Sequence, residues 1–485
     1  MQKEFFSSRW GFIFAALGMA LGTGNVWRFP RIAAKNGGGV FIIAWIAALF
    51  LWSIPILIME IGMGKNTRKG VISAFGITGG MRYLWLGAFA VFCTMGITYY
   101  YSVVTGWCLK YFTASFSQTF FVNDSSVYWN SFISGNQPIL FHFFAVVLVS
   151  IIVYSGVVKG IERANKILIP SLFIFLIFLA IRALLLPGAE NGLNFLFNPD
   201  WSKLFDRNVW LEALSQSAWS SGAGWGLMLT YGIYSRQKED IVLNSFLTGF
   251  GNNTASLISA IAVLCTIFAI LPEQEALNAV SADNIGLTFV WLPKLIEKTP
   301  GGIFFMSGFF IALTFAAFSS LISMVEMAVR NFIDFGLTRK SAIIVVSIIV
   351  FCLGIPSAVS IEFFRNQDWV WGLGLIINGF FMSLVVIKYG VKRFRNDVIN
   401  TEGNDVRLGI WFDIIVKYII PLEFLSMIVW WFYQSVTLFE KSNWWNPFHV
   451  YSVGTCIFQW GIVLIIVLLF NKRMAGKLLQ RIKNS

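Results

Sequence analysis

The stretch "GMALGTGNVWRFP", residues 18–30, decides the fold. It lies inside an apolar run long enough to cross a membrane, yet it contains three glycines, an asparagine and an arginine. At membrane depth, backbone groups that leave a helix are tolerated only where protein or a water-filled cavity satisfies them. We therefore expect a helix that is broken at Gly22-Thr23-Gly24, with a polar site beside the break.

Composition indicates a membrane protein. Of the 485 residues, 57% are hydrophobic and 12% are charged, and long apolar runs recur along the whole chain. Counting these runs gives about twelve spans, which predicts an all-α integral membrane protein. The first run has no small-residue cleavage site after it, which argues against a removable signal peptide.

The net charge of +12 indicates how the chain is oriented in the membrane. The basic residues gather in alternate loops between the predicted spans, where they mark the cytoplasmic side. We therefore expect a multi-pass protein of the plasma (inner) membrane with both termini in the cytoplasm. The lipid bilayer is its expected surrounding, with neither nucleic acid nor an obligatory protein partner.

A second interruption, Gly222-Ala223-Gly224 in "QSAWSSGAGWG", lies five spans after the first. Because five is odd, two successive five-span units have opposite orientations, which predicts a 5+5 inverted repeat with helices 1 and 6 unwound. The expected units are 1–187 (helices 1–5), 188–395 (helices 6–10) and 396–485 (helices 11 and 12 with a cytoplasmic carboxyl terminus).

The residue types around the breaks favour a zwitterion together with a cation. A half-helix amino terminus offers donors to an anion, and unwound carbonyls offer oxygens to a cation. In "LTFAAFSSLISMVE", Ala316 and Ser320 share a helix face and Ser319 lies beside them, so this face offers several oxygens. Two alternatives remain: glycines that only allow close helix packing, and hydroxyls that bond back to their own helix.

Three motifs, "GTGNVWRFP" with "NGGGVF", "KGIERANKILIP" and "DIVLNSFLTGFGNN", resemble the neurotransmitter:sodium symporter family, within it the bacterial amino-acid transporters. The resemblance covers spans 1 to 10 by motif and spans 11 and 12 by hydropathy. It implies Na⁺-coupled transport on a fold with broken helices. It also agrees with the absence from the sequence of a paired nucleophile and base, so we do not expect an enzyme.

The resemblance implies two sodium sites, and so two Na⁺ ions. Sodium site 1 would use the substrate's carboxylate with Ala20, Asn25, Ser220 and Asn252. Sodium site 2 would use Gly18, Leu21, Ala316, Ser319 and Ser320.

The resemblance also implies a small-molecule substrate. Amine-transporting relatives have an aspartate at the position of Gly22, so this chain favours an amino acid that brings its own carboxylate. We expect a neutral, hydrophobic or aromatic L-amino acid, with glycine or another small amino acid as one alternative and a sensor that binds without transport as another. The expected substrate-binding residues are Met19, Ala20, Gly22, Thr23, Gly24, Ile97, Tyr101, Trp219, Ser220, Gly222, Gly224, Trp225, Ser320 and Met324.

Two gates are implied. Arg28 and Asp368 would form the outer gate, above a lid of Tyr101 and Trp219. The inner gate would pair Lys3 with Asp334, with Tyr234 and Glu326 nearby.

The chloride requirement is open at the level of sequence. Ser256 is typical of chloride-dependent relatives, but Trp45 replaces the tyrosine that usually helps to bind chloride. Glu212 lies one turn before Gln216, and we hypothesise that its carboxylate supplies the missing negative charge. An intramembrane carboxylate costs roughly 2.5 to 3.5 kcal/mol on insertion scales, so it normally has a role or a partner.

The hypothesis for Glu212 makes a direct prediction. Transport by Glu212→Gln should become dependent on added chloride, because the variant lacks the internal charge. Uptake measured in chloride and in gluconate buffers checks this, and an unchanged response to chloride in the variant would remove the idea.

Overall fold

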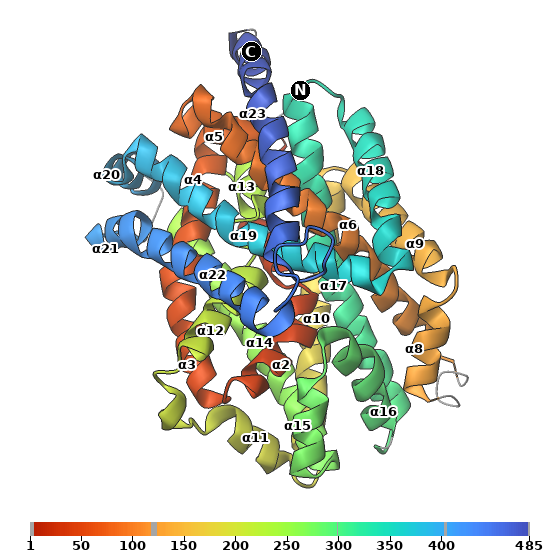
Figure 1. Cartoon of the computed structure of the whole chain (residues 1–485). Helices are drawn as coiled ribbons and strands as arrows, with labels where there is room; N and C mark the ends of the chain where they lie inside the picture. Colours follow the sequence, from red (N-terminus) through yellow and green to blue (C-terminus); the bar gives the residue numbers. More distant parts are fainter. Residues whose placement is uncertain (1–3, 118–123, 298, 402–404, 484–485) are drawn as a thin grey trace.

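The computed structural model describes residues 4–117, 124–297, 299–401 and 405–483, and nearly all of them are helical. Within these ranges, β pairing is confined to an isolated antiparallel bridge between Gly38 and Pro199. Figure 1 shows a helical bundle with both ends of the chain at the same end of the molecule. The predicted all-α membrane fold is confirmed.

In the first half of the chain the helices are α1 (Arg9–Ala20), α2 (Phe29–Lys35), α3 (Gly39–Ala48), α4 (Ile54–Thr67), α5 (Val71–Gly79), α6 (Leu84–Ala114), α8 (Ser125–Ile133), α9 (Gln137–Tyr154), α10 (Arg163–Leu184), α11 (Ala189–Phe197), α12 (Arg207–Ser220) and α13 (Leu227–Ile233). In the second half they are α14 (Ile241–Ile270), α15 (Glu273–Ser281), α16 (Leu292–Glu297), α17 (Gly302–Asp334), α18 (Arg339–Val359), α19 (Ile361–Tyr389), α20 (Val391–Phe394), α21 (Ile410–Ile414), α22 (Ile420–Gln434) and α23 (Val453–Lys483). Wider π-helical turns occur at Gly24–Arg28, Leu49–Ser53, Val157–Glu162, Gly286–Trp291, Arg395–Ile399, Ile415–Ile419 and Ser435–Phe439, and 3₁₀ turns at Met81–Tyr83 and Trp201–Lys203.

Nine helical runs in the described parts of the chain are long and apolar enough to cross a membrane. A tenth span is the bent pair Arg9–Ala20 and Gly24–Lys35, whose halves meet at 53°. The sequence predicts about twelve spans. The two that remain are helical, but one is interrupted and the other contains charged residues. One is the split pair α12 and α13, and the other, 410–439, contains Asp413, Lys417 and Glu423.

Both predicted breaks are present. α1 begins at a serine cap, where Ser8 Oγ accepts a hydrogen bond from the Gly11 amide at 3.0 Å, and it ends at Ala20. Leu21 leaves the helical region at φ −80° and ψ 85°, and Thr23 is back in it at φ −57° and ψ −30°, so the first break lies at Leu21 and Gly22. It begins one residue earlier than predicted.

The second break covers residues 221–226, between α12 and α13. Gly222, Gly224 and Gly226 have φ of 70°, 88° and 78°. Glycine adopts this left-handed conformation without steric cost, which explains why the break is rich in glycine.

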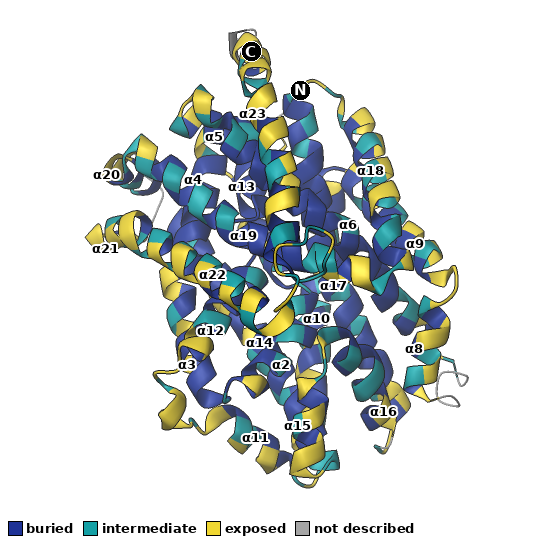
Figure 2. Ribbon diagram, in the orientation of Figure 1, coloured by how far each residue is buried: buried dark blue, intermediate teal, exposed yellow. Residues whose placement is uncertain are grey.

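The broken helices lie in the core of the bundle. Of the most apolar stretch of α17, 89% is buried, against 33% of that of α9, and Figure 2 shows the same contrast between dark-blue central and yellow peripheral helices. α4 and α13 approach closely because they face each other with glycines: a Cβ at Gly64 would lie 2.0 Å from the Leu229 carbonyl oxygen. Small residues of this kind are typical of tightly packed helices in membranes.

The predicted boundary at 187/188 falls in the connection between α10 and α11, and the boundary at 395/396 falls inside the turn Arg395–Ile399. The division into an inverted repeat remains a prediction.

Candidate functional site

A cavity of about 370 Å³ lies between the two breaks. It extends from the breaks past α6, α17 and α19 to the loop after α15 and to the end of α22. Of the residues predicted from the sequence, the following line it: Met19, Ala20, Gly22, Thr23, Gly24, Asn25, Arg28, Tyr101, Glu212, Trp219, Ser220, Gly222, Trp225, Ser320, Met324 and Asp368.

Two residues predicted to bind substrate do not line the cavity. Ile97 is fully buried one turn nearer the start of α6, below the level at which Tyr101 and Val104 face the cavity. Gly224 packs against α19 instead, where a Cβ would lie 3.0 Å from the Gly379 amide nitrogen. Of these two predicted glycines of the second break, Gly222 alone lines the cavity.

The first break is held by Tyr101. The Tyr101 hydroxyl accepts a hydrogen bond from the Thr23 amide at 3.1 Å. A Cβ at Gly22 would lie 3.0 Å from this hydroxyl and 3.0 Å from Ser320 Oγ. A side chain at position 22 would therefore displace these hydroxyls of α6 and α17 by at least a few tenths of an ångström.

The oxygens of predicted sodium site 1 converge on the Asn252 amide. The Asn252 side-chain amide can be placed in two orientations. In the first, its oxygen lies 2.8 Å from the Ser220 carbonyl oxygen and 3.2 Å from the Ala20 carbonyl oxygen. In the second, the Asn252 side-chain nitrogen takes the place of the oxygen and lies 2.7 Å from the Asn25 side-chain nitrogen. Like atoms face each other in either orientation, and a cation among the oxygens would remove the conflict. The residues present therefore fit a sodium ion.

The oxygens of predicted sodium site 2 are also brought together. Ser319 Oγ lies 3.2 Å from the Leu21 carbonyl oxygen and 3.0 Å from that of Ala316. Ser320 Oγ lies 3.4 Å from the Gly18 carbonyl oxygen. The hydroxyls bond across to the first break as well as back to their own helix, so local back-bonding is only part of their role.

The second break is held by Glu60, which the sequence analysis missed. Its carboxylate accepts hydrogen bonds from the amides of Gly224 at 2.8 Å, Gly226 at 3.1 Å and Leu229 at 3.1 Å. Glu60 is fully buried on α4, and these amides belong to the break, at Gly224, and to the cap and first turn of α13, at Gly226 and Leu229. An anion is favoured there by the unpaired amides and by the helix dipole. The signal in the sequence was a carboxylate inside the apolar run "IPILIMEIGMG".

The predicted outer gate is open. Both Arg28 and Asp368 line the cavity, but no ion pair within 4.0 Å joins these two described side chains. The Arg28 guanidinium instead stacks 5.1 Å from the Trp219 ring centre and donates to Ser215 Oγ at 3.3 Å. Nearer the surface, Arg365 pairs with Asp283 at 2.6 Å across the cavity mouth.

The end of the molecule near the chain termini is closed by aromatic packing. Phe6 is buried and makes edge-on contacts with Phe12, Tyr231 and Tyr234. Its amide donates to the Tyr234 carbonyl at 3.0 Å, so the chain before α1 is bound to the end of α13.

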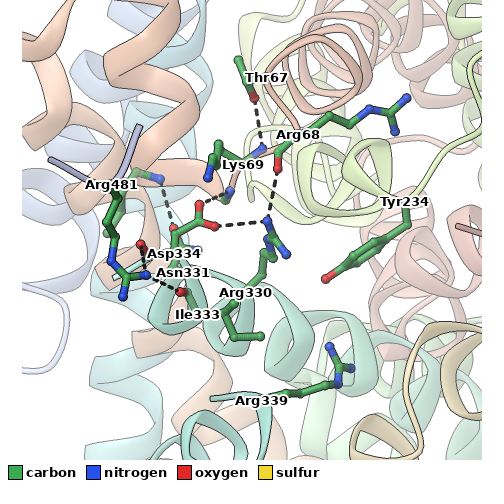
Figure 3. A network of polar contacts seen from close by, with 12 residues as sticks. Thr67, Arg68, Lys69, Tyr234, Arg330, Asn331, Ile333, Asp334, Arg339 and Arg481 are labelled. Atoms are coloured by element: carbon green, nitrogen blue, oxygen red, sulfur yellow. Dashed lines mark hydrogen bonds and ion pairs between the residues drawn. The ribbon is translucent and has the colours of Figure 1, made fainter. Parts of the chain in front are cut away.

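A polar network surrounds this closed end (Figure 3). Asp334 pairs with Arg330 at 3.1 Å and accepts a hydrogen bond from the Gly70 amide at 2.6 Å. Arg481 of α23 donates to the Asp334 carbonyl oxygen at 3.2 Å. Lys3, the predicted partner of Asp334, lies outside the described residues.

Tyr234 and Glu326 lie beside this network, in contact with each other. The Tyr234 hydroxyl donates to Glu326 at 2.5 Å, and Arg339 pairs with the same carboxylate at 2.7 Å. Glu326 is therefore already neutralised by an arginine from α18.

The predicted chloride region contains buried polar atoms without partners. Trp45 Nε1 and both side-chain polar atoms of Gln216 have no hydrogen-bond partner within the described residues. Ser256 Oγ accepts from Asn25 Nδ2 at 2.8 Å. Glu212 lies one turn from Gln216 but lines the main cavity together with Arg28. Unpaired buried donors such as Trp45 Nε1 are suited to an anion.

Broken helices facing a cavity, with oxygens gathered at both breaks, define a class of membrane transporters that move a solute together with ions. Comparison with known proteins agrees. The model of the sodium:neurotransmitter symporter family matches residues 3–136 and 137–476, so the chain belongs to this family.

Individual relatives point the same way. An uncharacterised sodium-dependent transporter of Methanocaldococcus jannaschii is 31% identical over 454 residues, which cover 88% of this chain and 90% of the relative. A sodium-dependent serotonin transporter of Drosophila melanogaster is 24% identical, covering 100% of this chain and 85% of the relative. The crystal structure of MhsT in complex with L-phenylalanine matches with a TM-score of 0.78 and 29% identity, covering 88% of this chain and 99% of MhsT. The protein is therefore a sodium-dependent membrane transporter.

The role of Glu60 can be tested by Glu60→Gln. A neutral amide presents one oxygen and one nitrogen to amides that all donate, so at least one donor loses its acceptor. We expect a loss of roughly 1 to 3 kcal/mol in stability, and a loss of transport. The apparent melting temperature in detergent and sodium-driven uptake measure the two effects.

Glu423→Gln is the matched control. Glu423 is also a carboxyl among apolar residues, on the 15-residue helix α22, but its buried Oε2 has no hydrogen-bond partner in the described part of the chain, so the amide should leave melting temperature and uptake unchanged. Equal behaviour of the two variants would contradict the capping role of Glu60.

Proposed function

We propose that the protein is a sodium-coupled symporter that imports a neutral, hydrophobic or aromatic L-amino acid by alternating access. The observation that carries this proposal is the set of oxygens at the two breaks. Those of Ala20, Ser220 and Asn252 meet beside the cavity, and those of Leu21, Ala316 and Ser319 meet on its α17 side. Hard cations prefer oxygen ligands of these kinds.

Two sodium ions would serve different purposes. The ion at site 1 would also bind the carboxylate of the substrate, which places ion and amino acid in one shell. The ion at site 2 would hold the first break against α17 without touching the substrate. Binding of both ions would stabilise the arrangement in which the cavity is complete, which is how an ion gradient shifts a conformational equilibrium.

The amino-acid class follows from both ends of the cavity. At the polar end, position 22 is a glycine and carries no side-chain anion to pair with a bare amine, and the hydroxyls of Tyr101 and Ser320 already lie close to it. The Thr23 amide and the Tyr101 hydroxyl would then meet the carboxylate of an amino acid. At the other end, Met19, Trp219, Trp225 and Met324 offer an apolar wall. MhsT, which has a similar fold, has been solved with L-phenylalanine.

Trp219 bears on the size of the substrate. It contacts Trp225 edge-on, with ring centres 5.9 Å apart, and lies so close to Gly372 that a Cβ there would be 2.2 Å from the indole. The glycine lets the indole pack back against α19. The space that this leaves favours a large apolar side chain over glycine or another small substrate.

The contacts at the two predicted gates support a conformation in which the cavity is open at one end of the molecule and closed at the other. Arg28 is held by Trp219 and Ser215 and not by Asp368, whereas the end near the termini is packed around Phe6. If the termini are cytoplasmic, this is the outward-facing state. Closure would bring Arg28 to Asp368 and move Trp219 over the substrate, and the opposite end would open as Phe6 leaves its aromatic neighbours.

Uptake into proteoliposomes tests the proposal. Purified protein should accumulate labelled L-phenylalanine when an inward Na⁺ gradient is imposed, and not when choline replaces Na⁺. Two ions per cycle predict a sodium dependence that is sigmoidal, with a Hill coefficient approaching about 2, the number of sites.

A panel of unlabelled amino acids then identifies the substrate class. Hydrophobic and aromatic L-amino acids should compete, whereas glycine and bare amines should not. Stronger competition by glycine would favour a small substrate, and sodium-dependent binding without uptake would favour a sensor. Dissipating the gradient with gramicidin is the control, because it removes accumulation without touching the binding site.

A further inference from the structure

The start of the helix formed by Val157–Glu162 and α10 places two polar side chains against α1. A Cβ at Gly11 would lie 2.1 Å from Glu162 Oε1, and a Cβ at Gly18 would lie 2.0 Å from Asn165 Oδ1. The two glycines are seven residues apart, about two helical turns, so they lie on the same face of α1. Both polar groups belong to the motif "KGIERANKILIP", whose role the proposed function does not explain.

The two polar side chains differ in their hydrogen bonding. The Glu162 carboxylate accepts from the Ser7 amide at 2.7 Å and from the Ser7 hydroxyl, and it pairs with Lys166 at 2.6 Å. Asn165 donates through Nδ2 to the Ile161 carbonyl oxygen at 3.0 Å, but its Oδ1 has no hydrogen-bond partner among the described residues. The Asn165 side chain is fully buried. The contacts with Ser7 and Lys166 therefore account for the burial of the Glu162 carboxylate, whereas no such contact accounts for the burial of Asn165 Oδ1.

The position of this unpaired oxygen is informative. It lies against Gly18, whose carbonyl oxygen is a predicted ligand of sodium site 2 and lies 3.4 Å from Ser320 Oγ. The same Cβ position at Gly18 would be 3.3 Å from Ser319 Cβ, so α10, α1 and α17 meet there. A buried amide oxygen without a donor loses its hydrogen bonds to water and gains none from the protein. A weak contact with the Gly18 Cα hydrogen offsets only part of this desolvation cost.

We propose that Asn165 is a further sodium-binding residue, whose Oδ1 supplies an additional neutral oxygen to the ion at sodium site 2. The proposal rests on the proposed sodium coupling and extends it to a third helix. Sodium site 2 then draws oxygens from α1, α17 and α10. An ion held in this way stabilises the contact between the start of α10 and the first break, as well as that between α1 and α17.

Sodium alone, without any amino acid, tests this inference, because site 1 is incomplete without the substrate carboxylate. Purified protein is titrated with NaCl at constant ionic strength, with choline chloride as the replacement, and its melting temperature is recorded. Asn165→Ala should raise the half-maximal Na⁺ concentration about tenfold, as the loss of a residue that supports a metal site typically does. Asn165→Asp keeps an oxygen at this position and should bind Na⁺ at least as tightly as the wild type.

Asn244→Ala is the matched control. Asn244 of α14 is also buried, donates to the carbonyl oxygen four residues earlier at 2.6 Å, and has an Oδ1 that no described residue pairs with. It belongs to no predicted site, so its half-maximal Na⁺ concentration should equal that of the wild type.

The outcomes separate binding from packing. If Asn165→Ala melts at a lower temperature without Na⁺ but keeps the wild-type half-maximal concentration, Asn165 serves only packing and the inference is overturned. If the alanine variant does not fold, the comparison of Asn165→Asp and Asn165→Ser decides, because the shorter serine should bind Na⁺ more weakly. Equal half-maximal concentrations in those two variants would overturn the inference.

A double-variant cycle locates the effect. In a Ser320→Ala background, where site 2 is already weakened, Asn165→Ala should raise the half-maximal concentration much less than tenfold if both residues serve one ion. A full tenfold increase in that background would overturn the assignment to site 2. A wild-type protein that does not respond to Na⁺ would overturn the proposed sodium coupling itself, and the inference with it.

Discussion

The carboxylate of Glu60 has to satisfy the amides that the second break leaves without helical partners. Three of them, at Gly224, Gly226 and Leu229, donate to this one side chain from α4. Without such an acceptor, α13 would begin with bare amides in the middle of an apolar bundle, where each unpaired group costs several kcal/mol. The close packing of α4 and α13 through Gly64 and Gly232 brings the acceptor within reach. The cavity exists because both breaks are satisfied in this way, one by a carboxylate and the other by Tyr101 and the serines of α17.

Much of the fold was predictable because the breaks carry their own signals. Glycine, asparagine and arginine inside apolar runs locate them to within two residues, and the spacing of Ala316 and Ser320 places their oxygens on one helix face. Glu60 escaped prediction because its partners lie 164 or more residues later in the chain, and only the folded bundle brings them together. The sequence contained the hint, an isolated carboxylate in an apolar span, but not its target.

Two of the predicted substrate-binding residues lie outside the cavity, and the reason is geometric. Ile97 and Tyr101 share a face of α6, yet they differ by about 6 Å along the helix axis, and the sequence does not specify how deep the cavity extends. Gly224 was assigned to the cavity because it belongs to the second break, but the left-handed backbone turns it toward α19. Periodicity predicts the direction in which a residue points. Depth along the axis, and the course of an unwound segment, depend on contacts with helices distant in sequence.

The oxygens gathered at the two breaks belong to carbonyls, hydroxyls and amides, and none of these groups is charged. A sodium ion held by them keeps its whole positive charge, and a zwitterionic amino acid adds none. If two such ions enter with one zwitterion, as proposed, and no counter-charge moves with them, the cycle is electrogenic: it carries current, and membrane voltage does work on it directly. Each charge moved through 100 mV contributes roughly 2.3 kcal/mol, so even equal sodium concentrations on the two sides leave a driving force for accumulation.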